Sequence, residues 1–574
     1  MIPVDAKHGR SRSRRTTSLA ACLTGALLLL PGCAHVPEVS QDWDTLIINA
    51  RIVDGTGSPW YRGSVAVSGE TIAWVGTGEP DSDRAERVID AADKVLSPGF
   101  VDMMGQGSMP YLTDPASAGS KLMQGITLHA SGEGWTPAPQ TPETQPEPQI
   151  IDGVPYRWST YEDYFCLLES YGVPVNLVHN VGATQARLVV IGEENRPPSA
   201  SELARMQQLV AEAMEAGATG LSSALIYPPS TYQTTEELTA LAEAIRPYGG
   251  VYTTHLRNES SKLLEAIDEA LEIGRQAGVP VHIYHLKAAG EGNWPLIDEA
   301  LAKLEQARAE GMDVTADIYP YLRNGLGLGA FLPPDAYAQG RASLREALAD
   351  PEVRASLKAR IEEDGDWENW FHHIGRDWNN VQIIDSSLGP DVVGLSIQEA
   401  ADLRGVDAWQ FLFDTLAEVE IAVAPLSMNP EQKAAILQKP FIMFDTDISP
   451  VSPERNGSAT HPRAYGSMAR VLALYVREEG LLTLEDAVRR MTSASTNRLG
   501  MFDRGRIAAG QAADMVLFDP DTIQDHATYE HPAQYPTGID YVWVNGTLAV
   551  EHGELTDARA GRVLRHGAAT GQCH

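Results

Sequence analysis

The segments VYTTHLR at residues 251–257 and VHIYHLK at residues 281–287 share one sequence pattern. Each is a run of β-branched, apolar and small residues that ends in a histidine, and a basic residue follows two positions later. A run of this kind is typical of a buried strand. We therefore expect His255 and His285 to emerge at the C-terminal ends of two strands. If these strands are neighbours in a parallel sheet, the two imidazoles lie side by side and can begin a metal site.

Similar strand-like runs recur along the middle of the chain and alternate with helical stretches. This alternation predicts an α/β fold, a (β/α)8 TIM-like barrel over residues 98–503, with its active site at the C-terminal ends of the strands. The interval between the last two runs is far longer than an ordinary crossover, which predicts an inserted cap at about residues 326–435. The predicted strand runs are residues 100–104, 127–130, 175–179, 220–224, 251–255, 281–285, 314–319 and 441–447.

Both ends of the chain carry short alternating runs separated by turn residues, which is the pattern of β-hairpins. Residues 43–97 hold one set, and residues 504–566 hold another, in which Asn545-Gly546 is a type I′ turn signal. We expect the two sets to form a single small β-sandwich domain built from both chain ends.

The first 33 residues have the features of an export signal. Five basic residues precede an apolar stretch from Leu19 to Leu30, and Pro31-Gly32-Cys33 follows. This arrangement predicts a lipoprotein-type signal peptide at residues 1–33 and a polar tether at residues 34–42. We expect lipidation of Cys33 and a periplasmic location in the cell envelope. A plain secretory signal is the alternative, because the apolar stretch is too short to span a bilayer comfortably.

The composition is that of an acidic globular protein. Of the 574 residues, 43% are hydrophobic and 21% are charged, and the formal net charge is -33. Removal of residues 1–32 takes this charge to about −37, and such a surface repels nucleic acid and anionic lipid. The expected partner is a small-molecule or short-peptide substrate, with membrane attachment only through a lipidated Cys33.

Four cysteines are present, and two of them, Cys22 and Cys33, lie in the predicted signal. The other two, Cys166 and Cys573, are far apart in sequence. The chain has no framework of spaced cysteine pairs, so we expect both to be free thiols.

Two carboxylates complete the chemistry that the histidines suggest. Glu133 follows the second predicted strand, and Asp447 ends the eighth. Zinc binds imidazole nitrogen and carboxylate oxygen, and a catalytic zinc site leaves a position for water. Glu133, His255 and His285 are therefore the predicted ligands. Asp447 is the predicted general base, with Asp445 as its rival farther from the strand end.

Each of these residues alone also has a structural explanation. A histidine at a strand end is more often hydrogen-bonded than metal-bound, and a carboxylate in a loop often caps a turn or helix. The four residues nevertheless follow strands two, five, six and eight of one predicted barrel. This shared placement favours a functional site.

Several motifs are similar to those of a known family. The segment SPGFVD at residues 97–102, together with the two strand-end histidines, resembles the amidohydrolase superfamily. Further motifs are similar to the N-acyl-D-amino-acid deacylase (D-aminoacylase) family within it, and the resemblance covers roughly residues 44–566. These motifs are THLRNE at 254–259, HLK at 285–287, DIYPY at 317–321, HPRAYG at 461–466, YEHP at 529–532 and GRVLR at 561–565.

The resemblance implies a zinc-dependent hydrolase that cleaves the amide of an N-acyl-D-amino acid, or of a peptide with a D-residue, by attack of metal-bound water. It assigns His255 and His285 to the metal and Asp447 to the proton shuttle. The third ligand of the family is a cysteine, and Glu133 stands at that position here. A carboxylate is a harder donor that can also coordinate zinc.

The resemblance also implies contacts with substrate. Arg463 matches the arginine that grips the substrate carboxylate, a task for which a planar guanidinium is well suited. Lys287 and Tyr319 match further substrate-contacting groups, and Arg257 in the THLRNE motif is also expected to bind substrate. The family has a serine six positions after that tyrosine, whereas this chain has Gly325. One hydroxyl expected to contact the substrate carboxylate is therefore missing.

The first predicted strand departs from the superfamily pattern. A His-x-His pair should follow Gly-Phe-Val-Asp, but those positions hold Met104 and Gln106. A second metal therefore lacks its principal ligands, and we expect one zinc ion per chain. A single zinc ion can both activate water and polarise a carbonyl. Gln106 is expected to hydrogen-bond substrate or water, and a space-filling role is an equal alternative.

These observations predict an exported, zinc-dependent amidohydrolase similar to N-acyl-D-amino-acid deacylases. A cyclic amide or lactone hydrolase of the same superfamily is the first alternative. A catalytically inactive, ligand-binding lipoprotein is the second, motivated by the missing histidine pair, although a pure binding protein has no need of Asp447. The sequence does not specify the acyl group or the D-side chain.

Overall fold

The structure is a computed structural model and describes residues 42–78, 80–363, 365, 367–456, 460–567 and 573. The predicted signal peptide with Cys33, and the predicted tether apart from its last residue, lie outside the described residues. Within the described part of the chain, no helix combines the length and the apolar character that crossing a membrane requires.

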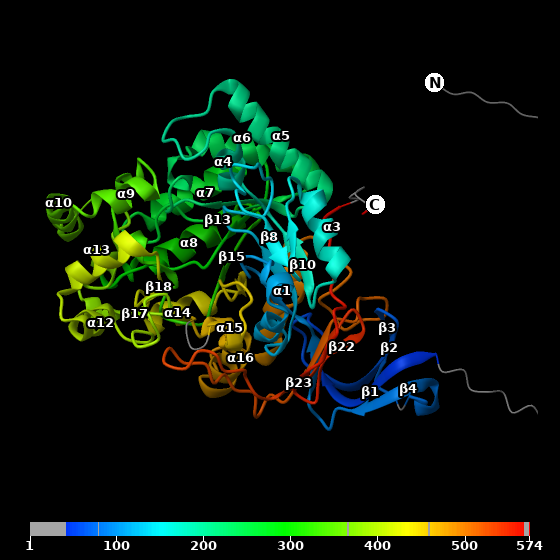
Figure 1. The fold of residues 1–574 in the computed structure, drawn as a ribbon. Helices are drawn as coiled ribbons and strands as arrows, with labels where there is room; N and C mark the ends of the chain where they lie inside the picture. Colours follow the sequence, from blue (N-terminus) through cyan, green and yellow to red (C-terminus); the bar gives the residue numbers. More distant parts are fainter. Residues whose placement is uncertain are drawn as a thin grey trace, which may run out of the picture. The chain divides into compact units, whose positions relative to one another are not determined.

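Every predicted strand run contains a strand, and the strands pair in parallel in chain order. Figure 1 shows β13 and β15 of this set, with helices α5, α6 and α7 above them in the view. Hydrogen bonds outside the strand ladders close the ring at two places. The amide of Thr219 donates to the carbonyl of His179 at 2.8 Å, and the amide of Met103 donates to the carbonyl of Phe444 at 3.3 Å. The strands are β6 (Phe100–Asp102), β7 (Ile126–Ser131), β10 (Asn176–His179), β12 (Gly220–Ala224), β13 (Val251–His255), β14 (Val281–Ile283), β15 (Val314–Ile318) and β19 (Ile442–Phe444).

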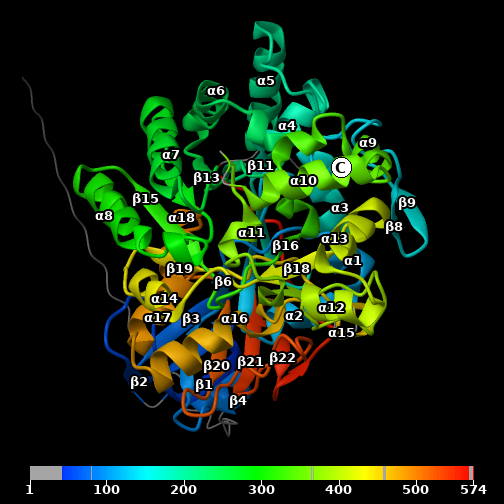
Figure 2. The same cartoon turned by 90° about the vertical axis from the view of Figure 1, so that its left-hand side faces the viewer.

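Amphipathic helices cover the outside of this ring (Figure 2). The helix at residues 200–216 illustrates how the sequence sets their ends. Ser199 and Glu202 form a capping box at its start, and Gly217 ends it in the left-handed conformation that glycine adopts without strain. The helices around the barrel are α3 (Tyr161–Tyr171), α4 (Ala183–Val190), α5 (Ala200–Ala216), α6 (Thr235–Ile245), α7 (Leu263–Ala277), α8 (Leu296–Ala309), α14 (Pro430–Leu437), α16 (Arg463–Arg470), α17 (Leu484–Met491) and α18 (Ser493–Arg498).

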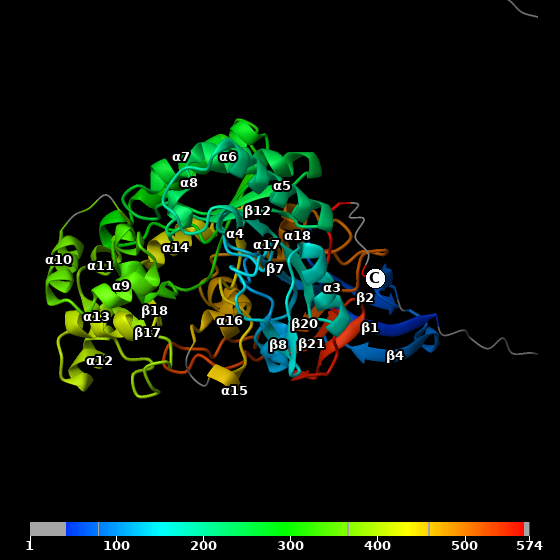
Figure 3. The same ribbon diagram turned by 45° about the horizontal axis from the view of Figure 1, so that its top comes forward.

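The two chain ends form one β domain, as the turn pattern predicts (Figure 3). Its nine strands belong to a single hydrogen-bonded sheet, so the expected sandwich of two sheets needs correction. The sheet folds back on itself, because a bridge joins Thr71 in its edge strand to Ala512. The strands are β1 (Trp43–Ile52), β2 (Tyr61–Ser68), β3 (Thr71–Gly76), β4 (Ala85–Asp90), β5 (Val95–Pro98), β20 (Met515–Phe518), β21 (Ile539–Val544), β22 (Thr547–Glu551) and β23 (Glu554–Leu555).

The long segment between β15 and β19 builds a separate layer with its own apolar core, which includes Trp370 and Trp378 (Figure 3). Three antiparallel strands in the order β16-β18-β17 form its sheet. Its elements are β16 (Leu326–Gly327), β17 (Val381–Ile383), β18 (Ala422–Pro425), α9 (Arg341–Ala347), α10 (Pro351–Glu362), α11 (Trp370–His373), α12 (Ile397–Arg404) and α13 (Ala408–Glu418).

Cys166 on α3 and Cys573 form a disulfide, with their Cα atoms 5.3 Å apart, so the expectation of two free thiols is wrong. A separation of 407 residues offers no spacing signal. Among the described residues that precede Cys573, Arg565 contacts Glu162 on α3 at 2.8 Å.

Candidate metal centre

The three predicted ligands meet at one point on the barrel rim. Glu133 lies just beyond β7, His255 is the last residue of β13, and His285 follows β14. Oε1 of Glu133 is 2.8 Å from Nδ1 of His255 and 3.3 Å from Nε2 of His285. One ligand atom from each residue lies within 4.8 Å of the others. Since both imidazoles point a ring nitrogen at the same carboxylate, the cluster offers a compact N,N,O donor set.

This donor set fits a divalent metal ion. Two imidazole nitrogens and one carboxylate oxygen are the ligands of a catalytic zinc-type site that keeps a position for water. Burial and the ammonium of Lys287 lower the pKa of His285, but the carboxylates of Glu259 and Glu133 outweigh them and raise it to about 10. The cluster thus attracts positive charge, and metal binding must displace this proton because metals bind neutral imidazole.

Glu259, the last residue of the THLRNE motif, is a further residue of the site. Its side chain is 1% exposed, with one oxygen 3.0 Å from Nδ1 of His285 and the other 3.5 Å from Nε2 of His255. These are the ring nitrogens that face away from Glu133. Glu259 therefore holds the imidazole of His285 from behind and lies close to that of His255, which is the usual place of a carboxylate next to metal-binding histidines. Its place four residues after His255 was the available signal.

Lys287 lies behind the ligands with Glu259. Its ammonium donates to Oε1 of Glu259 at 2.6 Å and to the carbonyl oxygen of His285 at 2.9 Å. The side chain is 1% exposed. Lys287 is therefore engaged in holding the histidines and their carboxylate partner, although it borders the metal cavity.

Asp447 lies just beyond β19 and is linked to the ligand cluster through the side chain of Gln106. Its Oδ1 accepts a 2.9 Å hydrogen bond from Nε2 of Gln106, and its Oδ2 accepts a 2.7 Å hydrogen bond from Nη1 of Arg463. The rival, Asp445, is fully buried and does not border the metal cavity. Burial and the charges of Asp317 and Asp447 raise the pKa of Asp445 well above its usual range. Asp447 is thus the carboxylate that faces the reaction space.

Arg463 stacks over Tyr319, with the guanidinium carbon 4.8 Å from the ring centroid. Only one terminal nitrogen of the guanidinium, Nη1, donates a short hydrogen bond to Asp447. Nη2 is 3.5 Å from the carbonyl oxygen of Gly325, and Nε is buried with no hydrogen-bond partner among the described residues. The guanidinium therefore keeps unused donors, which suits it to a second carboxylate.

Gln106 stands between the two carboxylates of the site. Its Nε2 donates to Oε2 of Glu133 at 2.8 Å and to Oδ1 of Asp447 at 2.9 Å. Gln106, His285 and Asp447 all have positive φ angles, of 61°, 36° and 46°. Such backbone geometry is costly for residues other than glycine and clusters at functional sites.

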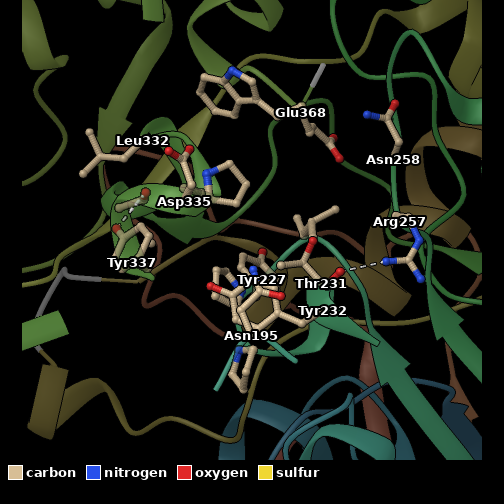
Figure 4. Close-up of a pocket in the computed structure, with 18 of the residues that line it drawn as sticks. Asn195, Tyr227, Thr231, Tyr232, Arg257, Asn258, Leu332, Asp335, Tyr337 and Glu368 are labelled. Carbon is tan, nitrogen blue, oxygen red and sulfur yellow. Dashed lines mark hydrogen bonds between the residues drawn. The ribbon is translucent and has the colours of Figure 1, made fainter. Parts of the chain in front are cut away.

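Two cavities border this region. The metal cavity has a volume of about 320 Å³ and is lined by all the predicted residues except Arg257. A second cavity of about 750 Å³ lies between barrel loops and the cap, and Arg257 lines it (Figure 4). Tyr227 and Trp370 line both cavities.

Arg257 differs from its expected role. Its guanidinium donates two 2.8 Å hydrogen bonds to Glu269, and others to the carbonyl oxygens of Thr231 and Gln233 (Figure 4). These contacts hold the loop at residues 231–233 against α7, and they engage the donors that a substrate carboxylate would need.

Comparisons with known proteins agree with a metal-dependent hydrolase site. A model of the Amidohydrolase family matches residues 87–550. A D-aminoacylase of Alcaligenes xylosoxydans xylosoxydans is 31% identical over 534 residues, which span 92% of this chain and 99% of that protein. An N-acyl-D-glutamate deacylase of the same organism is 32% identical over 533 residues, which span 92% and 98%. A solved N-acyl-D-glutamate deacylase from Bordetella bronchiseptica, complexed with zinc and a phosphonate inhibitor, is 29% identical, has a TM-score of 0.75, and the match covers 91% of this chain and 100% of that one.

Proposed function

Because this chain belongs to the amidohydrolase family and is a metal-dependent amidohydrolase, we propose that it hydrolyses the amide bond of N-acyl-D-amino acids or of peptides that carry a D-residue. One observation carries the proposal. The N,N,O ligand cluster, the carboxylate of Asp447 and the guanidinium of Arg463 border a single cavity of about 320 Å³. The relatives that are deacylases of D-amino acids support this choice of substrate.

One zinc ion per chain is held by Glu133, His255 and His285. When bound, such an ion activates water and polarises the carbonyl of the scissile amide. Asp447 takes the proton of the attacking water and delivers it to the leaving nitrogen. Its hydrogen bonds from Gln106 and Arg463 aim the carboxylate at the cavity.

Arg463 binds the α-carboxylate of the substrate through the donors that Asp447 leaves unused. The ring of Tyr319 supports the flat face of the guanidinium at 4.8 Å. The substrate carboxylate is held at Arg463 and the acyl carbonyl at the ligand cluster. With both groups held, the side chain on the intervening Cα points into free space in only one of the two enantiomers. These two attachments, together with the space left for the side chain as a third point, are the basis of the proposed D-selectivity.

The acyl or peptide part extends past Tyr227 and Trp370 into the second cavity. Its volume of about 750 Å³ exceeds what an acetyl group needs. The lining includes aromatic and acidic side chains, among them Tyr232, Tyr337 and Glu368 (Figure 4). Larger acyl groups or short peptides are therefore favoured over acetyl.

The protein is exported as a periplasmic lipoprotein anchored through Cys33. The disulfide between Cys166 and Cys573 supports export, because disulfides persist in oxidising compartments. The mature protein, labelled with a fatty-acid analogue in cells, should incorporate the label, and Cys33→Ser should not.

A substrate panel tests the enzymatic proposal. Purified mature protein loaded with zinc is assayed on matched D- and L-enantiomers of N-acyl amino acids, on dipeptides ending in a D-residue, and on a cyclic amide. Asp447→Asn should lower kcat about 10²–10⁴-fold, while Asp445→Asn should change it little, because burial and the neighbouring carboxylates raise the pKa of Asp445 and disfavour its charged form. Equal turnover of L-enantiomers, or turnover of the cyclic amide alone, would contradict the proposal.

A further inference from the structure

We infer that Gln106 is a positioning residue that takes the place of a second cation, because one amide holds the ligand Glu133 and the general base Asp447 together. The role of Asp447 as general base rests on the proposed function. The contacts of Gln106 and their effect on the ligand cluster do not depend on the identity of the substrate.

The geometry gives each of the two amide hydrogens of Gln106 a carboxylate acceptor. A primary amide nitrogen carries two N–H donors, and Nε2 lies 2.8 Å from Oε2 of Glu133 and 2.9 Å from Oδ1 of Asp447. The other oxygen of Glu133 faces the two histidines, and the other oxygen of Asp447 faces Arg463. The amide is therefore the central link of a chain of hydrogen bonds from the ligand cluster to the substrate-binding arginine.

Two ionised carboxylates that share a site repel one another unless positive charge or donors lie between them. A second metal ion is one solution, and the histidine pair that would hold it is replaced by Met104 and Gln106. The amide of Gln106 is another, since it is neutral and gives one donor to each carboxylate. Such hydrogen bonds to charged acceptors are stronger than those between neutral groups.

The backbone holds this amide in place. Gln106 has a φ angle of 61°, and its carbonyl oxygen accepts a 2.6 Å hydrogen bond from Oγ of Ser131. At the preceding residue, a Cβ on Gly105 would lie 2.6 Å from Nε2 of His129, so the loop passes directly over that ring. A strained, closely packed loop serves a purpose if the side chain it carries must point one way. A residue that merely fills space has no need of this arrangement.

Zinc binding to the purified mature protein tests the inference without substrate. Gln106→Met keeps the size of the side chain and removes both donors, and we expect it to weaken zinc affinity about 10–100-fold in chelator competition. Met104→Leu is the matched control from the same loop and should bind zinc as the parent does. Thermal denaturation of both variants checks that they fold.

Gln106→Glu supplies the complementary measurement. A third carboxylate between Glu133 and Asp447 creates a cation position, so metal analysis after equilibration with excess zinc should give two ions per chain instead of one. Zinc affinity at the parental level in Gln106→Met, or a single ion in Gln106→Glu, would overturn the inference. If zinc behaves as expected but no D-substrate is hydrolysed, the inference stands and the proposed function fails.

Discussion

Gly325 and Arg463 are packed so closely that a Cβ at residue 325 would lie 2.7 Å from Nη2 of the guanidinium. The guanidinium cannot retreat freely, because Asp447 holds one end and Tyr319 lies against its face. The absence of a side chain at residue 325 therefore sets where the arginine presents its free donors.

Gly325→Ser should weaken substrate binding. Displacing Arg463 costs about 1–3 kcal/mol, so we expect KM to rise about tenfold or more. Thermal stability should also fall, because the displaced guanidinium loses its contacts with Asp447 and Tyr319. Gly292→Ser is the control, since a Cβ there meets nothing within 4 Å. Steady-state kinetics on both variants provide the measurement. A lower KM would mean that the new hydroxyl contacts the substrate carboxylate.

Glu259→Gln should affect both stability and metal binding. The change removes the negative charge that lies 2.6 Å from the buried ammonium of Lys287, and breaking a buried ion pair in this way costs about 3–5 kcal/mol. Adding Lys287→Met should restore most of the stability. Zinc affinity should stay about 10–100-fold below the parent in both variants, because neither supports the histidines. Recovery of affinity with stability would assign Glu259 a purely structural role.

The metal-free protein should lose stability at alkaline pH. The pKa of His285 is raised to about 10 in the fold, above the ordinary value of about 6.5. Its protonated form therefore stabilises the fold fully below about pH 6.5, and this contribution disappears as the pH rises through about 10. Tm values of zinc-stripped protein between these limits measure the effect.

Zinc-loaded protein is the control for this measurement, because the ion replaces the proton and the dependence should vanish. Zinc affinity itself should increase with pH over the same interval, as protons compete less for the imidazole. A flat Tm profile of the metal-free protein would contradict the raised pKa.

Removal of the disulfide should lower stability by about 2–4 kcal/mol. Cys166→Ser and Cys573→Ser are expected to give the same loss, because each breaks the same bond between α3 and the C-terminal segment. Denaturant unfolding under non-reducing conditions measures it. Reductant should destabilise the parent to the level of the variants and leave the variants unchanged.

The sequence predicts the barrel well because its strands are marked by β-branched runs, such as the one ending at His255, that can be recognised from the local pattern alone. The convergence of Glu133, His255 and His285 follows from the same rule, since parallel strands bring their C-terminal ends to one rim. The turn signals also predict that both chain ends share one domain, but they do not specify whether it has one sheet or two.

Contacts that depend on tertiary packing could not be predicted from the sequence. The partner of Cys166 lies 407 residues away, and the saturation of Arg257 by Glu269 depends on how α7 meets a neighbouring loop. The bridging amide of Gln106 needs three loops to meet. Sequence spacing gives no distance between such loops.

The strand order of the β domain has a consequence for protein synthesis. β5 pairs with β20 in the middle of the sheet, so one edge of β5 stays open until residues 515–518 have left the ribosome. The whole barrel is translated during this interval. The sheet formed by the first strands is therefore completed only when the last strands have been made. A nascent chain that stalls after the barrel has an unpaired strand edge that can pair with another molecule.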